Sequence, residues 1–331
     1  MRLTAELHCH IEGAAPPDLV RRLGARHGIS LDGLFTCRGG YAWHDFTSFL
    51  TAYDRAASVF RTPEDYADLA HAHFAGAARN GMIYGEVFIS PDHAASSGLS
   101  YASYVEGLAA GIARAREETG VEGRMIVVGI RHLGAQAVER AACVMSEEPH
   151  PLVTGFGLAG DERVGRAADF ARAFKLAGEA GYGLTAHAGE FGGPESVAEV
   201  LDCLAVSRIG HGVRAIEDPA LVSRLAGEGT VLEVCPGSNI ALGLYPGFDR
   251  HPIGRLHRSG VAVTISSDDP PFFATTLARE YAETARAQGW GETELDALTR
   301  TALHAAFCDE ATRERLLARL EEKRPEQPAE S

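Results

Sequence analysis

Two histidines near the amino terminus have the spacing of a metal site. His8 and His10 are separated by one residue, at the end of a segment predicted as a strand, Leu3–His8. Alternate side chains of a strand point to the same face, so the two imidazoles face one way and Cys9 faces the other. A third imidazole, a carboxylate and an open position for water would complete a catalytic site for zinc or a similar ion.

Further donors follow three other predicted strands. His187 and Glu190 are the ends of the sequence His-Ala-Gly-Glu. His211 stands between two glycines, and Asp268 and Asp269 precede two prolines. Each group alone has an ordinary explanation, since paired aspartates before prolines are common in turns. Their joint position at the ends of strands favours a metal-dependent catalytic site.

A second His-x-His pair provides an internal comparison. His71 and His73 have the same spacing but lie in a segment predicted as a helix, Glu64–Asn80. Positions two apart on a helix diverge by about 200°, so these rings cannot share an ion, and we assign them to the surface or to packing. The remaining histidines, which we assign no catalytic role, are His27, His44, His93, His132, His150, His251, His257 and His304.

Eight segments with strand character alternate with long helical stretches. This pattern predicts an α/β fold, a closed (β/α)₈ barrel of the TIM type, whose catalytic groups lie at the carboxyl ends of the strands. Several strands are apolar throughout, as expected for parallel strands covered on both faces. The predicted strands are Leu3–His8, Met82–Ile89, Arg124–Arg131, Leu152–Leu158, Gly183–His187, Ser207–Gly210, Thr230–Cys235 and Val261–Ser267.

The segment between the first two strands is longer than one barrel helix needs. Residues 12–80 are predicted to hold about three helices, one of them over Trp43–Phe60, and to form a lid over the barrel mouth. Three helices are expected to follow the last strand and to wrap the outside, at residues 273–288, 291–306 and 309–322. Residues 1–323 are therefore predicted as one domain, and residues 324–331 have the composition of a disordered tail.

Charge and cysteine content restrict the partners and the compartment. The chain has 45 Asp and Glu against 31 Lys and Arg, a net charge of -14, which disfavours nucleic acid as a partner. No stretch has the length of a membrane span and no signal peptide is visible. The six cysteines are scattered, as in reduced proteins, and predict a cytoplasmic enzyme. The sequence leaves the oligomeric state open.

These stretches together resemble the adenosine/adenine deaminase family of metal-dependent amidohydrolases. The matching segments, in the order of the family, are Glu6–Gly13, Leu158–Glu162, His187–Glu190, Arg208–Gly212, Cys235–Asn239 and Ser266–Pro270. The resemblance implies a hydrolase that replaces the 6-amino group of an adenine-type purine with oxygen. Cytidine-type deaminases carry a different signature, H-x-E with P-C-x-x-C, which this sequence lacks.

The resemblance implies one zinc ion per chain, with His8, His10, His187 and Asp268 as its ligands. Relatives that hold two metals bridge them with a modified lysine on a barrel strand. Lys175 and Lys323 are the only lysines here, and neither falls on a predicted strand. The sequence therefore favours a single ion.

The resemblance also implies how the other residues act. Glu190 transfers a proton to purine N1, and His211 orients the attacking water and helps to deprotonate it. Asp269 exchanges a hydrogen bond or a proton with N7, the Gly160 N–H faces N3, and His10 lies beside the substrate as well as the metal. A carboxyl group at the ring edge is what the chemistry needs, because attack at C6 is easier when N1 is protonated.

The substrate is less clearly indicated. Glu12 stands where many adenosine-specific members have Asp for the ribose 5′ hydroxyl, and Gly157 replaces an Asp that is common among them. The Leu158–Glu162 stretch resembles the adenosine type, however. We expect adenosine or deoxyadenosine, giving inosine or deoxyinosine and ammonia. The alternative is adenine or an N6-substituted adenine, giving hypoxanthine.

Three other functions can be compared with single features of the sequence. Gly155, Gly157 and Gly160 fit the G-x-G-x-x-G spacing of an NAD-dependent dehydrogenase, but 37 glycines make a chance match easy. A metal hydrolase of the same superfamily acting on another ring would keep the metal ligands. A binding protein without catalysis would have lost Glu190, His211 or a ligand, and none is missing.

Overall fold

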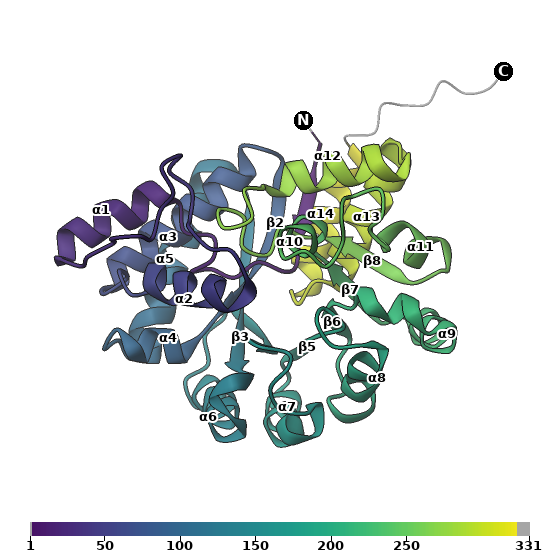
Figure 1. Ribbon diagram of the computed structural model, residues 1–331, viewed down its shortest axis with the longest axis horizontal. Coiled ribbons are helices and arrows are strands. Elements are labelled where there is room, and N and C mark those ends of the chain that lie inside the picture. Colours follow the sequence, from purple (N-terminus) through teal and green to yellow (C-terminus); the bar gives the residue numbers. More distant parts are fainter. Residues whose placement is uncertain (1, 323–331) are drawn as a thin grey trace.

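Eight parallel strands form the centre of the molecule, and each pairs with the next in chain order (Figure 1). The structure is a computed structural model that describes residues 2–322. The first and last strands meet at a parallel bridge between Cys9 and Asp268, where the His10 N–H donates to the Asp268 carbonyl at 3.0 Å. The predicted (β/α)₈ barrel is confirmed.

Every strand boundary lies within two residues of its predicted position. β2 and β3 are buried along their whole length, because barrel strands are covered by side chains inside and by helices outside. The strands are β1 Thr4–Glu6, β2 Met82–Ile89, β3 Glu122–Ile130, β4 Val153–Ala159, β5 Gly183–Ala188, β6 Arg208–His211, β7 Val231–Val234 and β8 Ala262–Ile265.

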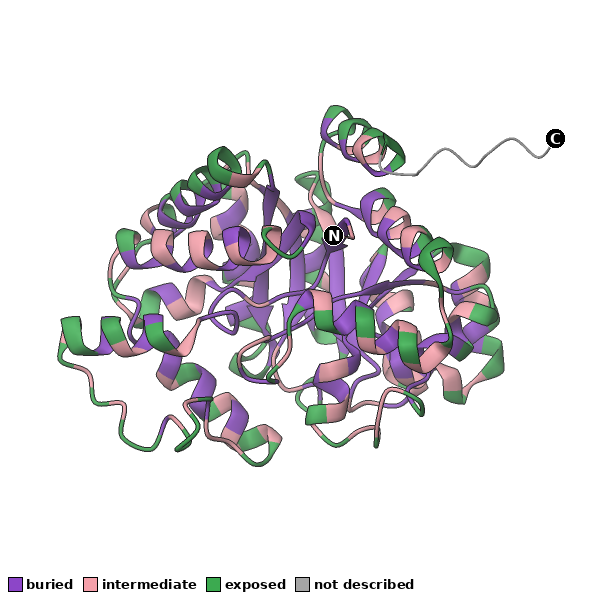
Figure 2. Ribbon diagram, turned by 90° about the horizontal axis from the view of Figure 1, so that it is seen from above, coloured by how far each residue is buried: buried purple, intermediate pink, exposed green. Residues whose placement is uncertain are grey.

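Helices surround the strands and turn their exposed faces outward, while the strands are buried at the centre (Figure 2). The helices from β2 to β8 are α4 Pro91–Ser96, α5 Tyr101–Thr119, α6 Ala135–Glu147, α7 Ala171–Glu179, α8 Pro194–Cys203, α9 Pro219–Glu228, α10 Pro236–Ala241 and α11 Ile253–Arg258.

The insertion after β1 has the predicted three helices: α1 Pro17–His27, α2 Phe46–Ala57 and α3 Pro63–Ala78. α2 is shorter than the predicted helix Trp43–Phe60. It begins after Asp45 because the Asp45 carboxylate accepts a hydrogen bond from the Ser48 N–H at 2.7 Å and the Ser48 hydroxyl caps the Asp45 N–H in return.

Three helices follow β8, as predicted: α12 Leu277–Gln288, α13 Glu292–Ala305 and α14 Glu310–Glu322. α12 begins at Leu277 instead of residue 273, because the Thr276 hydroxyl caps it by accepting from the Arg279 N–H at 3.2 Å. The preceding residues form a loop at the barrel mouth. The tail predicted at residues 324–331 lies outside the described residues.

Phe307, which follows α13, closes the end of the barrel opposite the mouth. The Arg208 guanidinium stacks 3.6 Å from the centre of the Phe307 ring. A Cβ atom at Gly183 or Gly155 would come within 2.3 Å or 2.7 Å of that ring. These two glycines therefore leave room for the aromatic plug, which fixes the closed end of the barrel while the other end stays available for a site.

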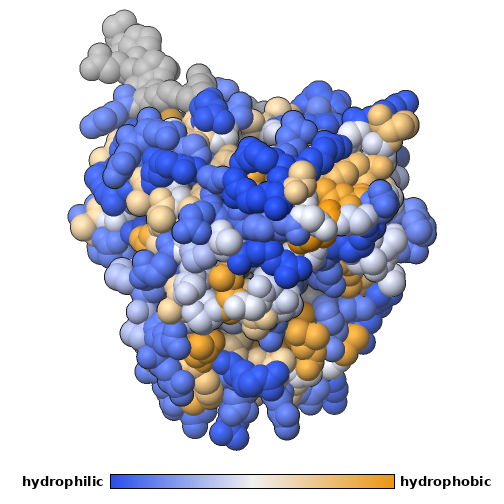
Figure 3. Space-filling model, turned by 90° about the vertical axis from the view of Figure 1, so that its left-hand side faces the viewer, coloured by the Kyte–Doolittle hydropathy of each residue, from blue (hydrophilic) through white to orange (hydrophobic). Residues whose placement is uncertain are grey.

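The outer surface is mainly hydrophilic on one side of the molecule. Hydrophilic side chains predominate on the face shown in Figure 3, with smaller hydrophobic patches between them. Within residues 2–322, no helix is both long and apolar enough to cross a lipid bilayer. The six cysteines are free thiols, as their scattered positions predicted.

Candidate active site

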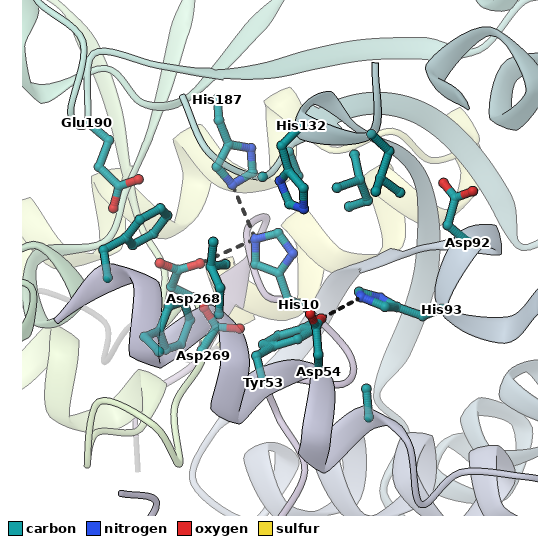
Figure 4. A pocket seen from close by; sticks show the side chains of 18 of the residues that line it. His10, Tyr53, Asp54, Asp92, His93, His132, His187, Glu190, Asp268 and Asp269 are labelled. Carbon is teal, nitrogen blue, oxygen red and sulfur yellow. Dashed lines mark hydrogen bonds and ion pairs between the residues drawn. The ribbon is translucent and has the colours of Figure 1, made fainter. Parts of the chain in front are cut away.

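Four potential metal ligands converge at the mouth of the barrel, and Figure 4 shows three of them, His10, His187 and Asp268. His8 and His10 follow β1, His187 lies on β5 and Asp268 follows β8. The Nε2 atoms of His10 and His187 are 3.2 Å apart. Asp268 Oδ1 lies 3.4 Å from His8 Nε2 and 3.5 Å from His10 Nε2. The structure thus brings together the four residues that the sequence singled out as ligands.

Hydrogen bonds behind the cluster orient two of its imidazoles. His8 Nδ1 lies 2.8 Å from the Glu233 carboxylate, and His187 Nδ1 lies 2.8 Å from the Leu158 carbonyl. Both partners are acceptors, so each Nδ1 carries a proton and each Nε2 is turned toward the cluster, where its lone pair can bind a metal once the ring is neutral. Because His8 Nε2 is buried without a hydrogen-bond partner, these converging lone pairs fit a divalent cation.

The electrostatic field at the cluster favours a positive charge. Burial lowers the pKa of His8, but hydrogen bonds with Asp268 and Glu233 outweigh that effect and raise it to about 9. Burial lowers the pKa of His187 to about 4, so this ring stays neutral and able to bind a metal. The Ser238 hydroxyl donates to Asp268 Oδ2 at 2.6 Å and holds the carboxylate in place.

A buried ion-pair network lies below the cluster, inside the barrel. Glu233 pairs with Arg208 Nε at 2.7 Å and accepts a hydrogen bond from the Thr185 hydroxyl at 3.0 Å. Arg208 also pairs with Glu86 at 2.6 Å. This network holds Glu233 ionised behind His8, because the positive charge of Arg208 offsets the effect of burial on its pKa. Sequence analysis did not identify Glu233, which lies in mid-strand and follows no motif spacing.

Glu162 holds the loop that carries Glu190. Its carboxylate accepts hydrogen bonds of 2.6 to 3.0 Å from four successive backbone N–H groups, those of Gly189, Glu190, Phe191 and Gly192. The Ser196 hydroxyl donates to the same carboxylate. Sequence analysis placed Glu162 in a matching stretch but gave it no role, although an acid just beyond a strand end was a usable signal.

Glu190 and Asp269 are carboxyl groups whose pKa values are raised. Burial, reinforced by the charges of Asp268 and Glu162, raises the pKa of Glu190 well above its usual range. The Glu190 carboxyl therefore keeps its proton to higher pH than an exposed carboxyl does and is suited to give a proton. Burial and Asp268 raise the pKa of Asp269 in the same way. Gly13 leaves room for Asp269, since a Cβ there would lie 1.6 Å from its Oδ1.

The backbone is strained at two residues of the site. His211 has a φ of 58° and Asp268 a φ of 64°, both in the left-handed region that non-glycine residues seldom occupy. Such conformations cost on the order of 1–3 kcal/mol each and cluster at functional sites. Here they turn the two side chains from the strand ends toward the cluster.

A chain of hydrogen bonds sets the proton position on His211. The Ile253 N–H donates to His251 Nδ1 at 3.3 Å, so the proton of neutral His251 is on Nε2, which faces Asn239 Oδ1 at 3.1 Å. The Asn239 amide nitrogen then donates to His211 Nδ1 at 3.3 Å. Burial lowers the pKa of His211 well below its usual range, so this neutral ring carries its single proton on Nε2.

The site opens into a cavity of about 350 Å³ beneath α2. Phe46, Phe49 and Tyr53 of α2 supply much of its apolar wall, so α2 acts as the predicted lid. The predicted site residues that line the cavity are His10, Gly160, His187, Glu190, His211, Asp268 and Asp269. His8 is fully buried below it.

Glu12 is placed differently from the expectation of a ribose contact. It is 1% exposed and does not belong to the lining of the cavity. Its carboxylate accepts hydrogen bonds from the Tyr104 hydroxyl at 2.7 Å and the Tyr53 hydroxyl at 3.2 Å. The carboxylate that was expected to receive a 5′ hydroxyl is thus buried against two tyrosines and is not part of the cavity lining.

Two histidines to which the sequence assigned no catalytic role lie at the outer end of the cavity. His93 and His132 line it, and His93 Nε2 lies 3.4 Å from Asp54 Oδ1 (Figure 4). Asp92 lines the same end. The signal for His132 was present, because it directly follows the third predicted strand. His93 lies on α4, the short helix after β2. The pattern of polar residues at strand ends does not indicate a residue on a helix.

The glycines that suggested a dinucleotide site have another explanation. Gly155 and Gly157 lie within β4, where a phosphate-binding turn cannot form, and Gly155 packs against Phe307. Gly160 has a φ of 94°, and a Cβ there would lie 2.7 Å from His132 Nδ1. The spacing therefore reflects barrel packing, and the dehydrogenase interpretation is not supported.

Comparison with known proteins gives a consistent picture. The profile described as adenosine deaminase matches residues 4–323. An adenine deaminase of Chelativorans sp. (strain BNC1) is 57% identical over 320 residues, covering 97% of this chain and 98% of the relative. An adenine deaminase of Agrobacterium fabrum (strain C58) is 57% identical over 318 residues, covering 96% and 98%. The crystal structure of adenine deaminase from Arthrobacter aurescens has a TM-score of 0.89 at 30% identity and covers 97% of this chain and 99% of that chain.

Proposed function

We propose that this chain, which belongs to the adenosine deaminase family, hydrolyses the 6-amino group of adenine and releases hypoxanthine and ammonia. The family and the named relatives make it a hydrolase that deaminates purines. The observation that carries the mechanism is one buried cavity that joins a four-donor cation site to Glu190, an acid whose pKa is raised well above its usual range.

Two observations support adenine over adenosine, the substrate that the sequence alone favoured. The relatives that are 57% identical along nearly the whole chain are named adenine deaminases. In addition, Glu12 is bound by Tyr53 and Tyr104 and lies outside the cavity lining. A ribose would not find Glu12 as the acceptor for its 5′ hydroxyl, whereas a free base has no such group to satisfy.

We assign one zinc ion to His8, His10, His187 and Asp268. Three imidazoles and a carboxylate are a donor set that zinc accepts, and none of the eight strands contains a lysine that could bridge a second ion. When bound, the ion supplies Lewis-acid activation of the attacking water. Glu233 and Leu158 hold two of the rings in the orientation that this requires.

The protein groups then divide the proton transfers. Glu190 gives its proton to purine N1, which makes C6 more electrophilic. His211, with its proton on Nε2, orients the attacking water as a hydrogen-bond donor and, contrary to the expectation from the sequence, does not take a proton from it. Asp269 holds N7 while the Gly160 N–H faces N3. A C6–O bond forms and the C6–N bond breaks. One proton of the water leaves with ammonia, and the other restores Glu190.

The direct experiment measures ammonia release from adenine together with bound metal. The parent loaded with zinc should release ammonia, and Asp268→Ala should bind zinc at least about tenfold more weakly and lose activity. Asp202→Ala, at an exposed pair with Arg224, is the matched control and should retain both properties. Full activity in Asp268→Ala without bound zinc would refute the assignment.

A further inference from the structure

A second group of metal-binding side chains lies beside the catalytic cluster. Glu6, Cys9 and His73 offer a carboxylate oxygen, a sulfur and an imidazole nitrogen, all within 4.8 Å of one another. These residues are 1%, 0% and 9% exposed. This mixture of oxygen, sulfur and nitrogen donors suits zinc and the transition metals next to it.

A bend in the first strand produces this arrangement. Regular alternation would turn Glu6 to the same face as His8. However, β1 ends at Glu6 and the chain bends at Leu7. Glu6 and Cys9 therefore both approach α3, whereas His8 and His10 join the catalytic cluster. A strand that continued to His8, as predicted, would not have brought the second group together.

Two donor atoms of this group have no hydrogen-bond partner. Glu6 Oε2 and His73 Nε2 are both buried and unpartnered, and they lie 3.9 Å apart. This distance is too long for a hydrogen bond. Donors at about 2.0–2.3 Å from a tetrahedral zinc ion lie about 3.5 Å from each other, so small movements would let these atoms share an ion.

Two of the three residues line a cavity, and the pKa of one of them is shifted in the direction that favours metal binding. Glu6 and His73 line a cavity of about 190 Å³ between α3 and the loop before α12, through which an ion can enter. Burial lowers the pKa of His73 to about 4, so its ring is neutral at pH 7 and available as a ligand. The sequence placed His73 at the surface or in packing; it is buried, and it also belongs to the lining of this cavity.

We propose that Glu6, Cys9 and His73 form a second site for a divalent transition-metal ion, separate from the catalytic cluster and weaker than it. It is weaker because it offers three protein donors, one of them a thiol that must lose its proton. The tightly bound metal therefore remains one ion per chain, and the second site fills only when metal is added in excess.

The second site is connected to the catalytic one through Ser267. Glu6 Oε1 accepts hydrogen bonds from the Ser267 N–H at 2.7 Å and from its hydroxyl at 2.6 Å. Ser267 directly precedes Asp268, the ligand with strained backbone. An ion that draws Glu6 toward His73 loosens this support, so filling the site should lower kcat. This coupling rests on the proposed function, whereas the binding of the ion does not.

The test is a titration of the zinc-loaded full-length protein with Co²⁺, followed by optical absorption. The proposed site contains a thiolate, so one added equivalent should produce a cobalt–thiolate charge-transfer band in the near ultraviolet. His73→Leu, which keeps a similar volume, should weaken the cobalt affinity at least about tenfold. His71→Leu is the matched control on the same helix, because His71 pairs with Glu118 at 2.9 Å away from the group, and it should titrate as the parent does.

The outcomes separate the binding claim from the coupling claim. The binding proposal is wrong if the parent takes up no second ion, or if the band is unchanged in His73→Leu, which would place the thiolate elsewhere. Cooperative thermal unfolding of His73→Leu without cobalt would show that this variant is folded. If His73→Leu does not fold, Cys9→Ser tests the same site, and a charge-transfer band that survives in Cys9→Ser would overturn the proposal. The coupling is wrong if kcat for adenine is constant while the second site fills.

Discussion

Two neighbouring carboxyl groups, Asp268 and Glu190, are held in opposite protonation states. Burial raises the pKa of both, but a hydrogen bond with His8 and the surrounding imidazoles bring the pKa of Asp268 well below its usual range. Glu190 lacks that compensation and sits near negative charges instead. The environment thus suits one group to bind a metal and the other to give a proton, the division of roles that we propose for them.

This difference predicts how activity depends on Glu190 and on pH. Glu190→Gln should retain zinc and the fold but lose about 10²–10⁴-fold in kcat for adenine, because an amide cannot give N1 a proton. The pKa of Glu190 is raised and its protonated form is the active one, so the kcat of the parent should fall as pH rises through that pKa. The residual activity of the variant should lack this decline. A kcat within tenfold of the parent would mean that another group protonates N1.

The sequence indicated the proposed ligands but not the residues that support them. His8, His10, His187 and Asp268 were predictable because strand ends of a barrel meet at one rim, whatever the details of packing. Glu233 could not be found in this way, because it acts through its contact with His8, which lies far from it in the sequence. The role of Glu12 was also out of reach, because its two tyrosine partners come from α2 and α5.

At the scale of elements, the loop between β5 and α8 determines where Glu190 lies. Four backbone N–H groups of this loop converge on Glu162, which comes from the loop after β4. Hydrogen bonds to a charged acceptor contribute about 1.5–3 kcal/mol each, so Glu162 strongly favours one loop conformation. The same carboxylate contributes to the raised pKa of Glu190.

Glu162→Gln should therefore affect both position and proton affinity. We expect kcat for adenine to fall at least about tenfold, since an amide cannot accept from four N–H groups at once. Removing the negative charge should also lower the pKa of Glu190 and move the alkaline decline of kcat to lower pH. Glu199→Gln, in an exposed pair with Arg166, is the matched control and should change neither. An unchanged pH profile in Glu162→Gln would exclude the electrostatic role.

The elements were predicted well where periodicity alone defines them. Strand boundaries agree within two residues, because buried apolar runs are bounded by glycines and polar residues. The start of α12 was wrong because Phe272 and Phe273, which look like helix residues, pack against the lid: Trp43 Nε1 donates to the Phe272 carbonyl at 3.0 Å. Such tertiary contacts leave no periodic signal.

For the whole molecule, buried neutral histidines link stability to pH. The pKa of His73 is lowered by burial to about 4, against 6.5 for an exposed ring. The unfolded chain therefore binds a proton that the folded chain does not, and the stability from this group is present above about pH 6.5 and lost as pH falls toward 4. The full effect of such a shift is about 3 kcal/mol.

Chemical unfolding at several pH values measures this linkage. Between pH 6.5 and 4, the free energy of unfolding of His73→Leu should fall less steeply than that of the parent, by up to about 3 kcal/mol. His71→Leu provides the control and should follow the parent, since its ring is partly exposed and paired with Glu118. Parallel curves for His73→Leu and the parent would show that the pKa of His73 is the same in the folded and the unfolded chain.

The central claim is that the buried site at the barrel mouth deaminates adenine as the free base. The measurement that tests it most directly is kcat/KM for ammonia release from adenine and from adenosine, with the same zinc-loaded preparation. Because Glu12 is bound by two tyrosines and a ribose finds no acceptor there, kcat/KM should be at least about a hundredfold higher for adenine. Equal values, or a preference for adenosine, would contradict the account and restore the nucleoside as the substrate.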